Sequence, residues 1–372
     1  MKAPVAGTED HPQARMVLGT ALDGQPSHAY LFHGPAGTGK RTVARAFAAE
    51  LLAQGQPDPQ DTRRRALAGS HPDLTWVRPT GAHVMRTSDV DAPVIAAASR
   101  TPFEARRRVF VLERVETMND EVANRMLKTL EEPASFVHLI LLTDSLGQVL
   151  ETVVSRCQLV RFDPLPAERI AAALERDGVP AERARACGRI ALGNATRARY
   201  LASEEGSGLR AEVDGFVAAA LEGAQADEPW RPLLERAEAR RAEAEEACVA
   251  ERAERLELEP QGRERRALEK ELEEAAKRDG RRARTEVLDL GLSLAALGFR
   301  DLVCLAEGAD QAVLAADRAH GLGERVRGRD PRRLREAAER CEDARQSLEL
   351  NVSEDLALSA LGFRLTALVG AP

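Results

Sequence analysis

Aromatic residues and cysteines are scarce in this 372-residue chain. Aromatics make up 3% of the residues, so we expect a buried core built mainly from alanine, leucine and valine. The five cysteines are an odd number, and no two stand at the spacing of a metal knuckle; they are Cys157, Cys187, Cys248, Cys304 and Cys341. A disulfide framework and a cysteine-based zinc site are therefore not expected, and no metal site is predicted.

Long apolar runs and a large excess of basic residues are also missing. No stretch approaches the ~20 apolar residues that a membrane span needs, and residues 1–10 contain no apolar run of signal-peptide length. We therefore expect a cytoplasmic protein with no membrane partner. Lys and Arg number 53 against 60 Asp and Glu, a net charge of −7. This balance argues against a protein that grips nucleic acid by bulk charge alone.

Residues 12 to 165 alternate between helical and strand patterns. Continuous apolar runs predict buried strands at 29–32, 74–77, 109–112, 138–142 and 158–162. Helical patterns lie between them, at 12–22, 42–52, 91–98 and 118–131. Apolar strands separated by helices are typical of a parallel sheet that is covered on both faces. We therefore predict an α/β domain over residues 1–165.

After the last predicted strand the sequence contains no strong strand signal. Residues 166–206 are expected to form a small helical domain, and residues 207–372 an all-α domain. Residues 235–284 differ in composition, because 29 of these 50 residues are charged, 14 basic and 15 acidic. We interpret this segment as an inserted hairpin of two solvated helices, in which opposite charges meet four residues apart. It either recruits a partner or, as we favour, serves as a solvated spacer.

The first predicted strand runs into a glycine-rich turn that opens a helix. The turn has the sequence Gly34-Pro35-Ala36-Gly37-Thr38-Gly39-Lys40, and a strand before it and a helix after it are the context that a phosphate-binding P-loop requires. Glycines let backbone N–H groups turn inward, and Lys40 reaches the outer phosphates. The alternative is a glycine turn that merely links a strand to a helix.

The groups that hold Mg²⁺ and activate water in such a site are altered. The residue after the lysine, normally Ser or Thr for the metal ion, is Arg41, while Thr42 lies about 100° further around the helix. Where an ATPase offers Asp-Glu, the chain has Glu113 and Arg114. Because phosphoryl transfer depends on positioning and electrostatics, we expect ATP hydrolysis to be poor or absent, even if ATP binds.

Several motifs together resemble the bacterial clamp-loader AAA+ subunits of DNA polymerase III. They are residues 27–32, the P-loop, the Leu-Lys-Thr-Leu-Glu-Glu-Pro stretch at 127–133 and Ser-Arg-Cys at 155–157. The degraded nucleotide site and the stretch 347–358 look like the delta-prime type rather than the gamma/tau motor type. The resemblance covers about residues 10–205 and 286–369, and the charged segment between them matches no motif of the family.

The resemblance implies a RecA-like AAA+ core at 1–165, a helical lid at 166–206 and a collar domain at 207–372. It implies a stator that is largely inactive as an ATPase, in a ring with gamma/tau and delta subunits that loads the sliding clamp on primed DNA. The ring belongs to a DNA-directed DNA polymerase, a nucleotidyltransferase. Arg156 is then an arginine finger for a neighbouring subunit, worth ~10³–10⁵ in rate. A surface ion pair is the alternative for Arg156.

The resemblance also implies further site residues. Arg197 aligns loosely with the lid arginine that touches the γ-phosphate of its own subunit, and Thr143 stands where a polar sensor is expected. Asp144, beside it, is equally a turn cap. The residues implied to contact nucleotide are Gly34, Gly37, Gly39, Lys40, Arg41, Thr42, Glu113, Thr143 and Arg197. The four-cysteine zinc module of many such subunits is missing between Leu52 and Leu74.

Two other functions are compatible with these motifs. An active AAA+ ATPase of gamma/tau type would need the metal ligand and the catalytic carboxylate that the chain lacks. A P-loop kinase or switch protein with a coiled-coil arm would need a small-molecule acceptor site. The basic runs at 63–65, 106–108 and 281–282 are interpreted as solvated faces; any DNA contact they make would be to phosphates, without sequence preference.

Overall fold

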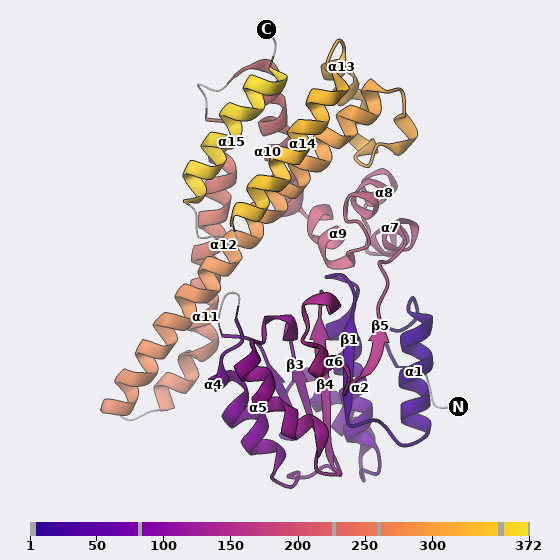
Figure 1. The fold of residues 1–372 in the computed structure, drawn as a ribbon, viewed down its shortest axis with the longest axis vertical. Coiled ribbons are helices and arrows are strands. Elements are labelled where there is room, and N and C mark those ends of the chain that lie inside the picture. The colour runs from indigo at the N-terminus through magenta and orange to yellow at the C-terminus, as the bar shows by residue number, and fades with distance from the viewer. Residues whose placement is uncertain (1–4, 81–83, 225–227, 259–261, 349–352, 371–372) are drawn as a thin grey trace. The chain divides into compact units, whose positions relative to one another are not determined.

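The computed structural model describes residues 5–80, 84–224, 228–258, 262–348 and 353–370 (Figure 1). These residues form two compact units. Unit 1 comprises Met1–Leu165 and Gly193–Ala195, and unit 2 comprises Pro166–Leu192 and Thr196–Pro372. The predicted division of the helical region into a lid and a collar stays a prediction.

Unit 1 is built on a five-stranded sheet. The strands are β1 (Ala29–His33), β2 (Leu74–Val77), β3 (Arg108–Leu112), β4 (Val137–Thr143) and β5 (Gln158–Arg161). They lie in the order β2-β3-β4-β1-β5, and every neighbouring pair is parallel. Tyr30 in β1 pairs with Ile140 on one side and Gln158 on the other. The predicted α/β class with a parallel sheet is confirmed.

Helices cover both faces of this sheet. One face carries α1 (Pro12–Asp23), α2 (Lys40–Ala53) and α3 (Pro59–Ala68). The other carries α4 (Thr87–Val90), the π-helix η1 (Asp91–Ala96), α5 (Asp120–Glu131) and α6 (Glu151–Val154). Short 3₁₀ turns follow β3 and β4, at η2 (Val115–Thr117) and η3 (Leu146–Gln148).

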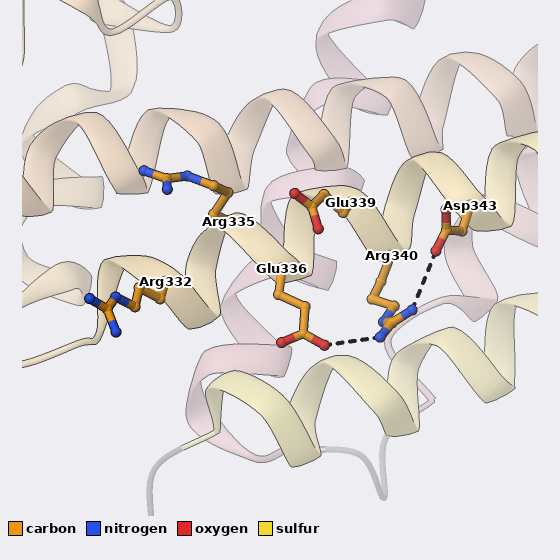
Figure 2. A pocket seen from close by; sticks show the side chains of 6 residues that line it. All are labelled: Arg332, Arg335, Glu336, Glu339, Arg340 and Asp343. Carbon is orange, nitrogen blue, oxygen red and sulfur yellow. Dashed lines mark hydrogen bonds and ion pairs between the residues drawn. The ribbon is translucent and has the colours of Figure 1, made fainter.

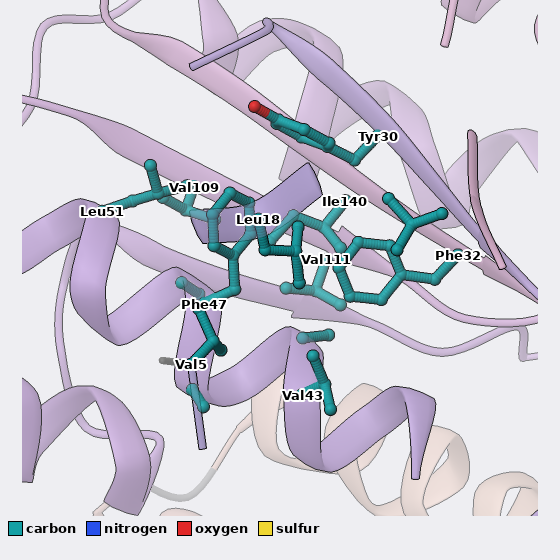
Figure 3. Close-up of a cluster of buried hydrophobic side chains, with 14 of the residues drawn as sticks. Val5, Leu18, Tyr30, Phe32, Val43, Phe47, Leu51, Val109, Val111 and Ile140 are labelled. Atoms are coloured by element: carbon teal, nitrogen blue, oxygen red, sulfur yellow. The ribbon is translucent and has the colours of Figure 1, made fainter. Parts of the chain in front are cut away.

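Side chains alternate between the two faces along each strand, as the pleat requires. Tyr30 and Phe32 pack with Phe47 of α2 in one buried cluster (Figure 3), whereas Ala29 and Leu31 belong to the cluster on the opposite face. Since both faces are buried, the strands appear in the sequence as continuous apolar runs rather than alternating ones.

Two helices of unit 1 differ from the sequence prediction. Helix α3 was not predicted; the Asp58 side chain accepts hydrogen bonds from the backbone N–H groups of Gln60 and Asp61 and so caps it. The helix predicted at 91–98 begins instead as the π-helix η1. Pro93 lies inside it and has no N–H to donate, which weakens the regular helical ladder there.

All the elements that the structure describes in unit 2 are helical. They are α7 (Ala167–Arg176), α8 (Ala181–Ile190), α9 (Ala195–Ala202), α10 (Glu204–Glu222), α11 (Arg231–Leu258), α12 (Arg263–Ala306), α13 (Ala319–Val326), α14 (Pro331–Ser347) and α15 (Glu354–Val369), with 3₁₀ turns η4 (Asp310–Ala312) and η5 (Ala316–Arg318). In the described part of the chain, no helix is long and apolar enough to cross a membrane.

Helices α11 and α12 run alongside each other and carry the charged segment (Figure 1). Small residues fill the contact between them, where Cys248 packs against Ala275 and Ala276. Ion pairs four residues apart line the outer faces, such as Lys277 with Glu273 at 2.5 Å. Exposed pairs of this kind contribute little to stability, because water solvates both charges.

Candidate functional site

The glycines of the P-loop adopt conformations that other residues rarely take. Gly34, Gly37 and Gly39 have φ values of +138°, +73° and +91°. A Cβ at Gly34 would lie 1.9 Å from the carbonyl oxygen of Phe162, and one at Gly37 would lie 1.7 Å from Asn194 Oδ1. Backbone geometry therefore favours glycine at all three positions, and at Gly34 the backbone of Phe162 also leaves no space for a Cβ.

Residues far from the motif hold the loop in place. His11 Nε2 lies 2.7 Å from the carbonyl oxygen of Thr38, and Thr38 Oγ1 donates to the carbonyl oxygen of Pro35 at 2.9 Å. The N–H of Ala195 donates to the carbonyl oxygen of Gly37 at 3.2 Å. Sequence reasoning missed His11, which stands in no recognisable motif, and it singled out the segment around Ala195 only for Arg197.

Lys40 is buried and bonded within its own unit. Its Nζ donates to the carbonyl oxygens of Gly34 at 2.5 Å and Pro35 at 2.7 Å, and it forms an ion pair with Asp144 Oδ1 at 2.7 Å. An ammonium group has three N–H donors, so these partners use all of them. Burial lowers the pKa of Lys40, and the Asp144 carboxylate opposes that shift. A phosphate that reached Lys40 would have to displace these partners.

Glu113, at the end of β3, is surrounded by hydrogen-bond donors. It is 2% exposed, and its Oε2 lies 2.5 Å from Arg41 Nη2. Its Oε1 accepts from Trp76 Nε1 at 2.6 Å and from Arg78 Nε at 3.2 Å. Both carboxylate oxygens are therefore engaged. Trp76 and Arg78 are site residues that the sequence did not reveal.

The site does not fit Mg²⁺. The ion prefers oxygen ligands in near-octahedral geometry, but Arg41 stands in place of the ligating hydroxyl and already pairs with Glu113. Among the described residues, no group of three or more His, Cys, Asp or Glu side chains is arranged to hold a metal ion.

A second carboxylate lies near Lys40. The Glu116 carboxylate acts electrostatically on Lys40, and its Oε1 lies 3.9 Å from Arg114 Nε. Its Oε2 is buried without a hydrogen-bond partner. Arg114 itself has a left-handed backbone, with φ of +54°. Directly after Glu113 the chain therefore has a basic residue, Arg114, rather than a carboxylate that could orient water.

The remaining residues predicted to contact nucleotide are Thr143, Thr42 and Arg197. The Thr143 hydroxyl is engaged in a local turn, where it donates to the carbonyl oxygen of Ser145 and accepts from the N–H of that residue, both at 3.1 Å. Asp144, and not Thr143, reaches Lys40. Thr42 is exposed on α2. Arg197 belongs to unit 2, where Asp289 is the main charge acting on it and burial lowers its pKa.

Arg156 lies at the surface of unit 1, in the turn between α6 and β5. Its Nε donates to Glu131 Oε1 at 2.9 Å, and its Nη1 donates to the carbonyl oxygen of Thr152 at 2.9 Å. One third of the side chain is exposed. Within this chain Arg156 thus forms a surface ion pair, which was the alternative to the arginine finger. Its action on a neighbouring subunit stays a prediction.

One predicted basic face is not solvated. In the run 106–108, Arg108 is 7% exposed and stacks over the rings of Phe103 and Phe110. In the run 63–65, Arg63 pairs with Glu50 at 2.7 Å. These interactions use the guanidinium groups for packing and internal pairing.

A surface hollow lies along helix α14 in unit 2 (Figure 2). Its lining residues are Arg332, Arg335, Glu336, Glu339, Arg340 and Asp343. The three positive and three negative charges sum to zero, and Arg340 pairs with both Glu336 and Asp343. The hollow therefore offers no excess charge for an ionic ligand.

Unit 1 is a P-loop domain of the AAA+ class: a parallel sheet with the loop after β1 and a buried carboxylate at the end of β3. Residues 11–166 match the family model described as "DNA polymerase III, delta subunit". This segment of the chain is therefore similar to the DNA polymerase III clamp-loader subunits that its motifs resemble.

Curated relatives of the same kind are similar to this chain. The chain is 34% identical over 148 residues to DNA polymerase III subunit delta' of Bacillus subtilis, covering 39% of this chain and 44% of the relative. It is 36% identical over 156 residues to subunit delta' of Pseudomonas aeruginosa, covering 41% and 47%. The match thus spans less than half the length of each relative.

A solved structure of a gamma subunit-related protein of DNA polymerase III, from Thermotoga maritima, is also similar. It is 16% identical, covers 96% of this chain and 99% of its own, and has a TM-score of 0.43.

Proposed function

We propose that this chain is a delta-prime-type subunit of the DNA polymerase III clamp loader that does not hydrolyse ATP itself. The observation that carries the proposal is the state of Glu113: its two oxygens are taken by Arg41, Arg78 and Trp76. Phosphoryl transfer needs a metal clamp and an oriented nucleophile, and this cluster supplies neither. An active gamma/tau-type ATPase is disfavoured for the same reason.

The proposed partners are the gamma/tau and delta subunits, with the sliding clamp and primed DNA reached through the ring. Helix α15 supports assembly, because it carries a row of exposed apolar residues. Leu356 and Phe363 are 66% and 56% exposed, and Ala360 and Ala367 are exposed as well. These four positions share one face of a helix, and large apolar side chains exposed together often mark an interface.

Arg156 is the residue proposed to act in the ring. It would stabilise negative charge on the phosphoryl group that is transferred in a neighbouring subunit. The guanidinium stands at the surface of unit 1, and its contacts with Glu131 and Thr152 fix its position. Lys40, Asp144 and the loop carbonyls would keep the chain's own loop in one conformation, as suits a stator.

The test is reconstitution. The full chain alone should turn over ATP below about 1 s⁻¹, the low end of ordinary enzyme rates. Mixed with gamma/tau and delta subunits, it should enter a stable complex that hydrolyses ATP in response to clamp and primed DNA. Faster turnover by the chain alone would favour the gamma/tau-type function. Failure to enter any complex would refute the proposal.

A further inference from the structure

The guanidinium groups of Arg41 and Arg78 both contact Glu113, the carboxylate that an active P-loop ATPase would use for a divalent cation. We propose that Arg41 supplies the charge of that cation, so that the loop binds the phosphate groups of a nucleoside triphosphate without Mg²⁺. This proposal adds a ligand to the proposed function. It rests on that function only because both treat residues 34–40 as a P-loop. It requires neither hydrolysis nor a ring.

The two guanidinium groups leave a positive charge around Glu113 without any metal ion. A single carboxylate that binds Mg²⁺ likewise carries a net charge of +1. Here the Glu113 carboxylate and the Arg41 and Arg78 guanidinium groups sum to −1 + 1 + 1 = +1. The region that faces the phosphates therefore keeps the positive charge that a polyphosphate needs, and Mg²⁺ brought to the same place would meet two cations.

Arg41 has enough N–H groups to bond to a phosphate and to Glu113 at the same time. A guanidinium has five N–H donors, and the contact with Glu113 is made through Nη2. The Arg41 side chain is 58% exposed and stands on the first turn of α2, directly after Lys40. Its remaining N–H groups can bond to phosphate oxygens in the bidentate manner that arginine favours.

The pairing of Glu113 also keeps Arg41 oriented. Trp76 Nε1 and Arg78 Nε hold Oε1 of Glu113, which leaves Oε2 for Arg41. Because Glu113 is buried at the end of β3, its carboxylate is a fixed anchor, and Arg41 is drawn across the end of the sheet toward it. A flexible surface arginine would lack this constraint.

The experiment titrates the full-length chain with a fluorescent ATP analogue, in Mg²⁺ and in EDTA. The wild-type dissociation constant should be equal in the two buffers to within about twofold. The variant Arg41→Ser should bind at least about tenfold more weakly in EDTA, because a bidentate phosphate contact is lost. The serine hydroxyl, with Glu113 released from Arg41, should also make binding at least about fivefold tighter in Mg²⁺ than in EDTA.

Arg45→Ser is the matched control. Arg45 lies one turn further along α2, where its guanidinium stands 4.5 Å from the centre of the Trp76 ring and its Nη1 donates to the carbonyl oxygen of Leu67 at 3.2 Å. Its substitution should change binding by less than about twofold in either buffer. Circular-dichroism melting of all three proteins checks that each is folded.

Three outcomes would overturn the inference: wild-type binding more than about fivefold tighter in Mg²⁺, unaltered binding of Arg41→Ser in EDTA, or no binding in either buffer. The last outcome leaves the proposed stator function intact, since that function needs no bound nucleotide. Conversely, metal-independent binding by a chain that enters no complex would support this inference and refute the proposed function.

Discussion

Arg156 and Glu131 form an ion pair that joins two sequence motifs across the surface of unit 1. Arg156 Nε donates to Glu131 Oε1 at 2.9 Å, and Nη2 bonds to the same oxygen. Nη1 donates to the carbonyl oxygen of Thr152 at 2.9 Å and to Ser155 Oγ at 3.2 Å. A guanidinium held by so many contacts has little conformational entropy left to lose when it meets a ligand.

Substitution of Arg156 should slow ATP hydrolysis in the assembled loader. For Arg156→Ala we expect assembly to be unchanged and single-turnover hydrolysis at the neighbouring site to fall by ~10³–10⁵, the range for an arginine finger. Quench-flow measurement on the reconstituted complex checks this. Arg161→Ala, which removes an exposed arginine paired with Asp163, should have no such effect. Equal rates for wild type and Arg156→Ala would exclude the finger role.

The two P-loop glycines Gly34 and Gly39 should differ in their tolerance of alanine. Both have positive φ, which costs a non-glycine residue roughly 1–2 kcal/mol. At Gly39 the added Cβ meets nothing within 4 Å, whereas at Gly34 it would lie 1.9 Å from a backbone oxygen of Phe162. Gly34→Ala should therefore lower the free energy of unfolding by at least about 2 kcal/mol more than Gly39→Ala. Urea denaturation of the two variants gives the comparison, and equal losses would contradict the close approach.

Removal of the Asp144 carboxylate should tighten nucleotide binding. Asp144 pairs with Lys40 at 2.7 Å, so it competes with phosphate for the ammonium and repels it. Asp144→Asn should lower the dissociation constant for ATP by about tenfold. Asp163→Asn, which removes an exposed carboxylate paired with Arg161, serves as the control in the same titration. Weaker binding by Asp144→Asn would show that the carboxylate supports the loop instead.

The protein should lose stability as the pH falls from 7 to 5. Burial lowers the pKa of His138 to about 4. Its Nδ1 lies 2.9 Å from the carbonyl oxygen of Ser27, while Nε2 is buried with no hydrogen-bond partner, so a proton on Nε2 would be unsatisfied. The folded state therefore favours neutral His138, and its contribution is complete above pH 6.5 and lost as pH falls toward 4.

For His138 alone, the expected loss between pH 7 and pH 5 is about 2 kcal/mol of unfolding free energy. Burial also lowers the pKa values of His33 and His71, which add to the loss in the same direction. In His138→Asn, the decrease between the two pH values should be smaller by about 2 kcal/mol. Urea unfolding at both pH values measures the difference, and an unchanged slope would exclude His138 as its source.

A buried ion pair should be essential to the cohesion of unit 2. Arg210, in α10, is 4% exposed, and its Nη2 lies 2.8 Å from each carboxylate oxygen of Asp317 in η5. Arg210→Met leaves the Asp317 carboxylate, which is 15% exposed, without its partner and should cost about 3 kcal/mol. The double variant Arg210→Met/Asp317→Leu should recover more than half of that loss. Thermal or urea unfolding of the full chain completes this double-mutant cycle.

The exposed pair of Arg231 and Glu228 is the control for that cycle. Arg231→Met should leave the free energy of unfolding almost unchanged, because water solvates both charges well. A comparable loss in Arg210→Met and Arg231→Met would mean that the buried pair contributes no more than a surface pair.

The local pattern of apolar residues was sufficient to predict the strands of the sheet in unit 1. Each strand is a short apolar run between polar turns, and the observed strands fall at the five predicted places because burial on both faces demands apolar residues throughout. Helix α3 was missed because its sequence is mostly polar, and the signal that starts it is a single cap, Asp58, before Pro59. The segment 91–98 is helical as predicted, but it begins as the π-helix η1, and Pro93 inside it has no N–H to donate.

The sequence by itself determined the kind of loop and its altered chemistry, since the glycines, Lys40, Arg41 and Glu113 can be identified from spacing within a short segment. Only the tertiary structure decided what these groups bond to. Arg41 meets Glu113, and Lys40 meets Asp144, because the parallel order β3-β4-β1 brings the carboxyl ends of distant strands to one edge. Such pairings depend on the order of the strands in the sheet, and no local sequence pattern specifies that order.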